Sequence, residues 1–438
     1  MPSNILNLPA YTVLALECDE HDYHIKVEVA EPLRFCKDCG SGETVSNGRR
    51  RQLVKDLPSH GKRVGIYIQA RRLKCKSCNT TFTEPLPEIS DKHEMTNRLV
   101  TWIQKQSIQR TFASVAAEAG LDEGTIRRIF NAHVEALEKT VSFETPEYLG
   151  IDEIHISQAR CVLTNIQAKT IVDMLPDRSK KTVINYLSQM EDRQRVELCT
   201  MDMWRPYREA VQVVLPKAIV VVDKFHVVRL ASDAMEKARR QIKDGMTDAE
   251  RKGLKRERYI LRKRQHDLND FERLRLDGWL KNYPLIGAAY SAKESFFAIY
   301  DATSPAEAKR LFRAWLQTVE PEIKPFFSDL VKAWINWEDY ILTYFTHPVT
   351  NATTEGINNL IRVIDRLGRG YSFEALRAKI LYTKGIHCEK KRPKFSRREV
   401  FGGHTYGVAE QGAFESYVEK SLGVDIDALV KMIEDGRF

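Results

Sequence analysis

The alternation of apolar and polar residues changes several times along the chain. Residues 11–30 (YTVLALECDEHDYHIKVEVA) alternate with a period of two, which predicts two strands joined by a polar turn. From Met95 to about Lys139, apolar residues recur at spacings of three and four, which predicts helices. The first third of the chain is therefore expected to be a β-module followed by a helical segment.

The pattern around residues 147–226 predicts three consecutive strands, then a helix, a strand, a second helix and a last strand. These stretches are YLGIDEIHI, CVLTNIQ, TIVDMLP, SKKTVINYLSQM, VELCTMDM, WRPYREAVQVVLP and AIVVVDKFHVV. Their order is typical of an α/β domain. Residues 230–345 show no strand pattern and predict charged amphipathic helices, as does the later stretch from Thr350 to His387.

Composition narrows the class of protein. The 438 residues are 43% hydrophobic and 29% charged, which is typical of globular rather than disordered proteins. No apolar run approaches the roughly 18 to 20 residues that span a bilayer. The first residues, MPSNILNLPAY, lack the basic and apolar regions of a secretory signal. We therefore expect a cytoplasmic protein with no membrane partner.

Two close pairs of cysteines form a strong metal-binding motif. Two residues lie between Cys36 and Cys39 and between Cys75 and Cys78, and 35 residues separate the two pairs. Two such turns can present four thiolates to one tetrahedral zinc ion, and four thiolates leave no open position for water. We expect one structural zinc, with a strand pair (RRRQLVKDLP and KRVGIYIQARRLKC) between the turns. The alternatives are four buried free cysteines or a redox role, and the latter lacks the βαβ context of thioredoxins.

Positive charge is concentrated in the same module. Residues 34–80 contain 12 Lys and Arg against 3 Asp and Glu, a net charge of +9, whereas the whole chain has +8. Such a patch predicts contacts with phosphates, and a merely solvated basic face is the alternative. The candidate DNA contacts in this patch are Arg49, Arg50, Arg51, Arg71, Arg72 and Lys74.

Residues 237–264 form a second basic run, with 12 basic and 4 acidic residues. This run too predicts either a phosphate-binding surface or a solvated helix.

Residues 112–130 (FASVAAEAGLDEGTIRRIF) predict a helix, a turn and a second helix. Phe112 and Val115 supply an apolar face, Gly120 ends the first helix, and Asp122 can cap the second. In a DNA-binding helix-turn-helix, the early residues of the second helix contact base edges. A generic helical hairpin is the alternative. The residues at the start of the second helix are Thr125, Arg127 and Arg128.

Three acids lie where metal-dependent chemistry would need them. Asp152 lies inside an apolar strand, Asp202 closes a later strand, and Glu355 begins the helix TNATTEGINNLIR. Carboxylates are ligands for Mg²⁺ or Mn²⁺. Three of them can hold two ions roughly 3.5 to 4 Å apart, an arrangement that cleaves phosphodiesters. An N-cap or a surface acid is the alternative for each residue taken singly.

Residues 11–387 as a whole resemble bacterial insertion-sequence transposases of the DDE type, in particular the ISL-type family. The resemblance lies in the cysteine pairs with RRLKCKSCNTTFTEPLP, and in GIDEIHI, TMDMWRPYREA, DKFHVVR and TNATTEGINNLIR. It implies a zinc-binding domain and a helix-turn-helix joined to an RNase H-like catalytic domain, with a helical insertion before the Glu-bearing helix. It also implies that Asp152, Asp202 and Glu355 are the metal-binding catalytic triad.

Asp223 competes with Asp202 for the second catalytic position. In an RNase H-like sheet, the strand before Asp202 neighbours the first strand, whereas the strand before Asp223 lies one further out. At about 4.8 Å per strand, Asp223 would begin roughly twice as far from Asp152. Asp223-Lys224-Phe225-His226 resembles the C/D-x-x-H motif that follows the second Asp in related transposases, including the hAT and Mutator groups. We therefore favour Asp202 as the ligand and treat Asp223 and His226 as accessory, with a core histidine as the alternative for His226.

Further DNA contacts are expected around the carboxylates. Trp204, just after Asp202, can stack on an unpaired base, and packing beneath the site is the alternative. Arg362 and Arg366 follow Glu355 on one predicted helix and are expected to face the DNA backbone.

Together these features predict a transposase that binds the terminal inverted repeats of an insertion sequence. Two metal ions would first promote hydrolysis of a phosphodiester, which frees a 3′ hydroxyl. The same ions would then promote attack of that hydroxyl on target DNA. A homodimer or larger synaptic complex, at the bacterial nucleoid, is implied by the task and the family. The alternatives are a zinc-containing DNA-binding regulator with an inactive RNase H-like domain, or a stand-alone RNase H-like nuclease.

The predicted fold class is multidomain, α+β and α/β, with a small zinc-binding β-module, a helix-turn-helix and an RNase H-like mixed sheet interrupted by an all-helical insertion. The expected divisions are 1–90 (β hairpin and zinc-binding domain), 91–145 (helix-turn-helix), 146–229 (catalytic domain, first part), 230–345 (helical insertion), 346–390 (C-terminal catalytic helices) and 391–438 (basic linker and helix).

Overall fold

The computed structural model describes residues 6–31, 33–141, 143–242 and 246–384. The predicted linker and helix at 391–438 lie outside these residues. The chain forms two compact units, Met1–Ser142 with Leu367–Tyr371 and Phe143–Arg366 with Ser372–Phe438. The finer division into six segments stays a prediction.

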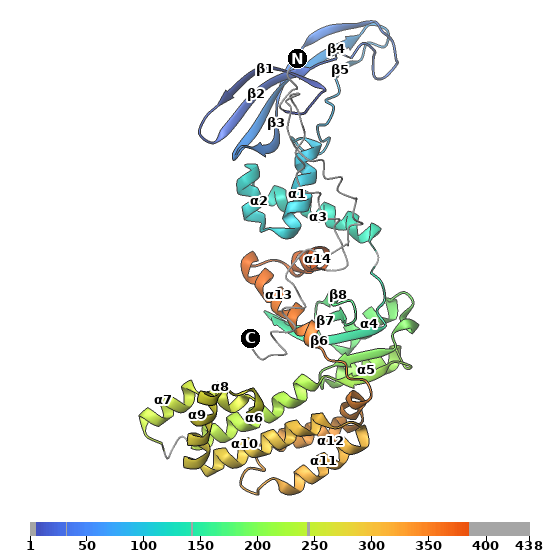
Figure 1. Cartoon of the computed structure of the whole chain (residues 1–438). Helices are drawn as coiled ribbons and strands as arrows, with labels where there is room; N and C mark the ends of the chain where they lie inside the picture. Colours follow the sequence, from blue (N-terminus) through green and yellow to red (C-terminus); the bar gives the residue numbers. More distant parts are fainter. Residues whose placement is uncertain (1–5, 32, 142, 243–245, 385–438) are drawn as a thin grey trace, which may run out of the picture. The chain divides into compact units, whose positions relative to one another are not determined.

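A five-stranded sheet forms the β-module of the first unit (Figure 1). Its order is β1-β2-β4-β3, with β5 paired to β4; β2 and β4 run parallel, and the other pairs are antiparallel. Along β4, every second residue from Val64 to Ala70 is buried, so one face of the sheet covers a core. Both expected strand pairs are confirmed. The strands are β1 (Tyr11–Cys18), β2 (Asp22–Val29), β3 (Thr44–Ser59), β4 (Lys62–Cys75) and β5 (Thr81–Thr83).

Three helices complete the first unit. The φ of +64° at Gly120 ends the second helix in a left-handed turn, a conformation that glycine adopts without strain. Asp122 then caps the third helix, because its Oδ1 accepts a hydrogen bond from the Thr125 N–H at 2.8 Å. The rings of Phe112 and Phe130 meet edge to face at 4.9 Å and fix the angle of the helix pair. The helices are α1 (Asn97–Gln109), α2 (Phe112–Ala119) and α3 (Glu123–Thr140).

The second unit contains a five-stranded mixed sheet of order β10-β9-β6-β7-β8. The strands β6, β7 and β8 are antiparallel, whereas β9 and β10 run parallel to β6. This is the expected RNase H-like sheet. The strands are β6 (Tyr148–Ile156), β7 (Gln158–Asn165), β8 (Thr170–Leu175), β9 (Leu198–Met201) and β10 (Ile219–Val222).

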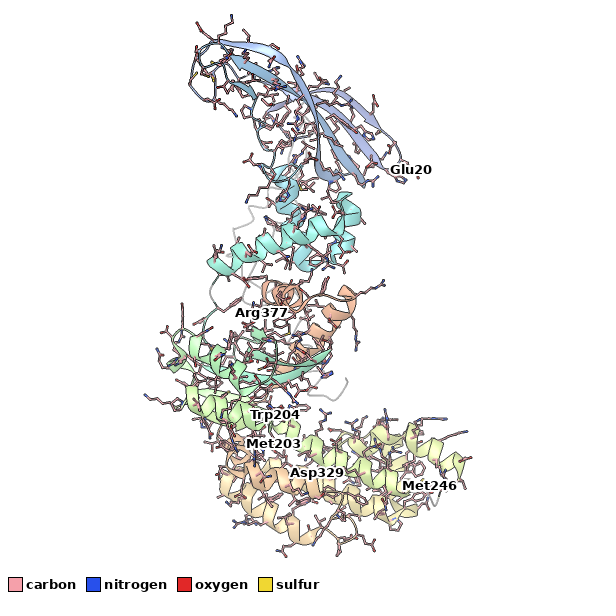
Figure 2. The ribbon with its side chains drawn as sticks, turned by 180° about the vertical axis from the view of Figure 1, so that it is seen from behind. Glu20, Met203, Trp204, Met246, Asp329 and Arg377 are labelled. Atoms are coloured by element: carbon pink, nitrogen blue, oxygen red, sulfur yellow. The ribbon has the colours of Figure 1, made fainter. Side chains whose placement is uncertain are left out.

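Helices from several parts of the described chain pack on this sheet. Buried residues of α4 (Lys180–Gln189) and α5 (Arg205–Val214) share one apolar core with the sheet. The C-terminal helices are α13 (Ala352–Gly368) and α14 (Phe373–Lys384). On α14, Arg377 forms a hydrogen-bonded ion pair with Asp173 of β8, Nε to Oδ1 at 2.6 Å (Figure 2).

The expected strand AIVVVDKFHVV is too long. Strand β10 ends at Val222, and α6 (Lys224–Gln241) begins two residues later. Asp223 is the N-cap of α6 and accepts a hydrogen bond from the Phe225 N–H at 3.4 Å. The cap starts the helix, and Val227 then packs into the helical core rather than the sheet.

The insertion between β10 and α13 is helical throughout its described residues, as expected. Its core is aromatic: the rings of Phe312 and Trp334 stack at 4.2 Å, and Trp315 packs beside Phe296 at 5.3 Å. None of the helices among the described residues combines the length and apolar composition needed to traverse a bilayer. After α6, the helices are α7 (Asp248–Arg256), α8 (Arg258–Arg262), α9 (Asp270–Asn282), α10 (Pro284–Phe297), α11 (Pro305–Thr318) and α12 (Ser328–Leu342). Short 3-10 turns lie at Arg193–Arg195, Gln265–Asp267, Ala298–Asp301 and Thr343–Phe345.

Candidate active site and zinc site

Three aspartates follow opposed residues of three adjacent parallel strands: Asp152 lies inside β6, whereas Asp202 and Asp223 come directly after β9 and β10. In the register of the sheet, Ile151 of β6 is opposite Met201 of β9, and Met201 is opposite Val222 of β10. The strand before Asp202 therefore neighbours the strand of Asp152, and the strand before Asp223 lies one further out, as predicted. Each of the three opposed residues is directly followed by an acid: Asp152, Asp202 and Asp223.

Asp152 is held by groups from three segments of the chain. It is 7% exposed, and its Oδ2 accepts a hydrogen bond from Nδ2 of Asn358 at 2.9 Å. Its Oδ1 accepts a second bond from the Glu153 N–H at 2.8 Å. Nε2 of His226, in the first turn of α6, lies 3.8 Å from Oδ1 of Asp152 and 3.8 Å from Oδ2 of Asp223. His226 thus lies between two of the carboxylates.

The first turn of α13 is fastened to the same end of the sheet. Nδ2 of Asn351, just before the helix, donates to the Ile151 carbonyl at 3.0 Å, and its backbone N–H donates to Oδ1 of Asp223 at 3.3 Å. The hydroxyls of Thr164 on β7 and Thr354 on α13 are hydrogen-bonded at 2.6 Å.

Gly150 on β6 permits this close approach of helix and sheet. A Cβ atom there would lie 2.4 Å from the Thr164 hydroxyl and 2.8 Å from that of Thr354. Both distances are shorter than van der Waals contact, so a larger residue would push the helix away from the strand.

Glu355 lies in the first turn of α13 and is exposed. It precedes Asn358 by three residues, so the two side chains are neighbours on one face of the helix. Asn358 contacts Asp152, so Glu355 lies within one helical turn of that contact, at an exposed position. Within the described residues its carboxylate makes no hydrogen bond or ion pair. The ligand oxygens of Asp152, Asp202 and Glu355 do not all approach within 4.8 Å of one another.

Burial governs the electrostatics of the aspartates. It raises the pKa of Asp152 to about 7; His226 opposes the rise, while Asp202 and Asp223 add to it. Burial also raises the pKa of Asp202 to about 7, with the Glu153 charge adding and the Arg178 charge opposing. The pKa of Asp223 is raised by burial as well. Burial thus disfavours the ionised form of all three acids. A bound divalent cation would stabilise the ionised carboxylates.

A second group of residues surrounds Asp202. Arg178 forms an ion pair with Glu153, and its guanidinium lies 4.1 Å from the ring centroid of Trp204. The Trp204 ring also packs against the sheet core, which supports the packing alternative, whereas the neighbouring Met203 contacts the core of the insertion (Figure 2). Oδ1 of Asp202 is buried and has no hydrogen-bond partner among the described residues.

Sequence reasoning missed several of these contacts. It assigned no role to Asn351 or Asn358, although both flank Glu355 in the motif TNATTEGINN. Glu153 and Arg178 gave no local signal at all, because they meet only when β6 and the segment before α4 are folded together.

The four paired cysteines come together at one end of the β-module. Their sulfur atoms all lie within 4.8 Å of one another, with Sγ–Sγ distances of 3.6 Å for Cys36–Cys78 and for Cys39–Cys75. In a tetrahedral site with Zn–S bonds of about 2.3 Å, the sulfurs would be about 3.8 Å apart. The Thr80 side chain and backbone lower the pKa of Cys78 to about 6, which favours a thiolate. The donor set and spacing fit zinc.

The predicted DNA-contacting residues differ in their surroundings. Arg50, Arg72 and Lys74 are exposed. Arg49 and Arg71 are cross-strand partners and both contact Glu28, at 3.2 and 3.7 Å, so part of their charge is neutralised. The Arg51 guanidinium lies over the Tyr67 ring at 4.9 Å.

The remaining predicted contacts lie on helices α3 and α13. Arg127 pairs with Glu123 at 2.5 Å and packs on Phe112, whereas Arg128 is exposed and donates to the Thr125 hydroxyl at 2.8 Å. On α13, Arg362 donates to Asn359 at 2.8 Å, and Arg366 is exposed.

Comparison with known families gives matches to three consecutive parts of the chain. The zinc-finger of transposase IS204/IS1001/IS1096/IS1165 matches residues 32–78. The helix-turn-helix domain of transposase family ISL3 matches residues 84–134, and the transposase domain of the same family matches residues 149–380. The last match alone spans more than half of the chain.

The fold and these matches define a transposase. More narrowly, the chain belongs to the ISL3 family of transposases. It is 24% identical over 346 residues to the transposase for insertion sequence element IS1001 of Bordetella parapertussis, which covers 77% of this chain and 85% of the relative. It is 25% identical over 268 residues to the transposase for insertion sequence element IS1557 of Mycobacterium tuberculosis, which covers 55% and 60%.

Proposed function

We propose that this transposase cleaves and joins DNA at a pair of divalent metal ions held by Asp152, Asp202 and Glu355. The observation that carries the proposal is the hydrogen bond between Asn358 and Asp152. It supports the proposal because it attaches the helix that carries Glu355 to the strand that carries Asp152, which neighbours the strand that Asp202 follows.

The residues present fit such ions. All donors are carboxylate oxygens, the ligands that Mg²⁺ and Mn²⁺ prefer, and the buried Oδ1 of Asp202 has no hydrogen-bond partner among the described residues. Bound ions would activate the attacking oxygen and stabilise the leaving oxygen of the phosphodiester.

The chain's own residues would prepare this site. Asn358 orients Asp152, and His226 offers a ring N–H or lone pair between Asp152 and Asp223. Arg178 neutralises the charge of Glu153 next to the site, and its guanidinium stacks on the Trp204 ring.

Asp202 suits the role of second ligand better than Asp223. Oδ1 of Asp223 already accepts the N–H groups of Phe225 and Asn351, which makes this acid the cap that joins β10, α6 and the start of α13. Asp202 keeps a carboxylate oxygen unpartnered among the described residues. We therefore keep Asp223 and His226 as accessory residues.

DNA recognition would belong to the N-terminal residues. Cys36, Cys39, Cys75 and Cys78 would bind one structural zinc. The exposed basic residues of β3, β4 and α3 would contact the terminal inverted repeats, with Arg128 at the start of the recognition helix. Joining two element ends requires at least a homodimer, acting at the nucleoid in the bacterial cytoplasm.

Incubation of the purified protein with element-end DNA and Mg²⁺ tests the proposal. Wild type should nick the end, expose a 3′ hydroxyl and join it to a second duplex, and Glu355→Gln should bind the same DNA and do neither. Binding without cleavage by wild type would favour the regulator. Cleavage without joining would favour the stand-alone nuclease.

A further inference from the structure

Two adjoining hollows lie between α6, α7 and α8 of the helical insertion. Their volumes are about 640 and 290 Å³, and both are lined by Glu236, Arg240 and Arg258. Eight cationic side chains and only two acids, Asp233 and Glu236, line the pair. The cations are Arg229, Arg239, Arg240, Arg251, Lys252, Lys255, Arg258 and Arg262. We call this surface the α6–α8 groove.

Positive charge in the groove is mostly uncompensated. Glu236 is already bound by Arg239, at 2.8 and 2.5 Å, and by Arg240 at 3.3 Å, so it cannot neutralise the others. Lys252, Lys255 and Arg258 are exposed, and none of them forms an ion pair within the described part of the chain. Cations that outnumber the neighbouring acids repel one another, and a bound polyanion would relieve that repulsion.

One helix, α6, connects the groove to the candidate active site. His226, which contacts Asp152 and Asp223, lies in the first turn of α6, and Arg229, one turn later, opens the groove. Arg240 follows His226 by 14 residues on the same helix. At a rise of 1.5 Å per residue, this is about 21 Å. A DNA strand advances about 3.4 Å per nucleotide along the duplex axis, so the distance corresponds to about six nucleotides.

We propose that the α6–α8 groove binds the phosphate backbone of the DNA whose cleaved phosphate lies at the aspartates, about one to six nucleotides away from that phosphate. This inference rests on the proposed function, because it says where the same DNA continues. Lys252, Lys255 and Arg258 contact backbone phosphates and read no bases. The groove therefore adds affinity and holds the scissile phosphate in place without adding sequence specificity.

A matched pair of triple variants of the full-length protein tests the inference. Lys252→Ala, Lys255→Ala and Arg258→Ala remove three charges from the groove. Lys281→Ala, Arg313→Ala and Lys332→Ala remove three exposed charges from α9, α11 and α12 that line neither hollow. All six residues are exposed, so both variants should melt at the wild-type temperature.

Binding is measured as a function of salt, without added divalent metal, on duplexes with the element end and with a shuffled sequence. For the groove variant, the negative slope of log affinity against log salt should be less steep by about 2 to 3 on both duplexes. Its affinity at low salt should fall at least about tenfold. Hydroxyl-radical footprinting should show lost backbone protection within about six nucleotides of the cleavage point, with the rest of the protected region retained. The control variant should resemble wild type in both measurements.

Equal salt slopes and footprints for the two triple variants would overturn the inference. A groove variant that changes only self-association would overturn it too, because the surface would then bind protein. If the groove variant loses slope and protection while wild type fails to cleave with Mg²⁺, the groove stands and the proposed chemistry fails.

Discussion

Asn358 donates a hydrogen bond to Asp152 across 206 positions of sequence, at 2.9 Å between Nδ2 and Oδ2. The bond joins α13 to β6, and the first turn of α13 carries Glu355. The helix that carries Glu355 is thereby attached to the strand that carries Asp152, although the helical insertion lies between them in the sequence.

Asn358→Ala should lower DNA cleavage by about 10- to 100-fold, because groups that orient metal ligands contribute about that much. DNA binding should be unchanged, and the Mg²⁺ concentration for half-maximal cleavage should rise. Asn359→Ala is the matched control, since Asn359 contacts Arg362 rather than Asp152. A cleavage defect with an unchanged Mg²⁺ requirement would mean that Asn358 acts only through stability.

Asp202→Ala should abolish nicking and joining while leaving end binding intact. A bound metal is worth several kcal/mol of transition-state stabilisation, so the loss should be about a thousandfold or more. Asp223→Ala should retain more activity but lower the melting temperature, because Asn351 and Phe225 lose the acceptor for their N–H groups. Gel assays and thermal melts distinguish the two variants. An active Asp202→Ala beside a dead Asp223→Ala would reverse our assignment.

The metal-free protein should lose stability as pH rises from about 4 towards about 7. Burial raises the pKa of Asp152 and of Asp202 from 3.8 to about 7 in the folded state, so folding takes up protons across this range. Mg²⁺ binds the ionised carboxylates, so its stabilising effect should be larger at about pH 8 than at about pH 5. Melting curves with and without Mg²⁺ measure this directly, and Asp152→Asn should flatten the pH dependence. A Mg²⁺ effect that does not change with pH would contradict it.

Zinc removal should unfold the N-terminal β-module. A structural zinc contributes about 10 to 16 kcal/mol of apparent folding free energy, more than a small module can lose. Cys75→Ser should therefore reduce bound zinc, measured by atomic absorption, and abolish end binding. Cys18→Ser, at an exposed cysteine outside the cluster, should bind one zinc per chain like wild type. Full zinc content in Cys75→Ser would show that the ion is held elsewhere.

Much of the fold could be predicted because it follows local patterns. Period-two alternation located β1 and β2, a strand pair was expected at β3 and β4, and the pattern after residue 147 located β6 to β9, whereas β5 was not predicted. Gly120 and Asp122 located the helix-turn-helix. The predicted end of β10 was wrong, because the sequence VVVDKFHVV stays largely apolar where the strand ends and the helix begins. Only the capping role of Asp223 marks that boundary.

The candidate site was partly predictable for a related reason. The resemblance to an RNase H-like sheet implied that the strand before Asp202 neighbours the strand of Asp152, and the observed strand order agrees. The contacts of Asn358 with Asp152 and of Arg178 with Glu153 depend on segments that meet only in the folded chain. Charge counting likewise identified the basic run at 237–264, but not which of its residues line a groove.

The most direct test is a map of anomalous scattering from manganese bound to the protein in complex with element-end DNA. We predict two peaks about 3.5 to 4 Å apart, contacted by Asp152, Asp202 and Glu355. Manganese bound by Asp223 and His226, with Glu355 remote from every peak, would contradict the account.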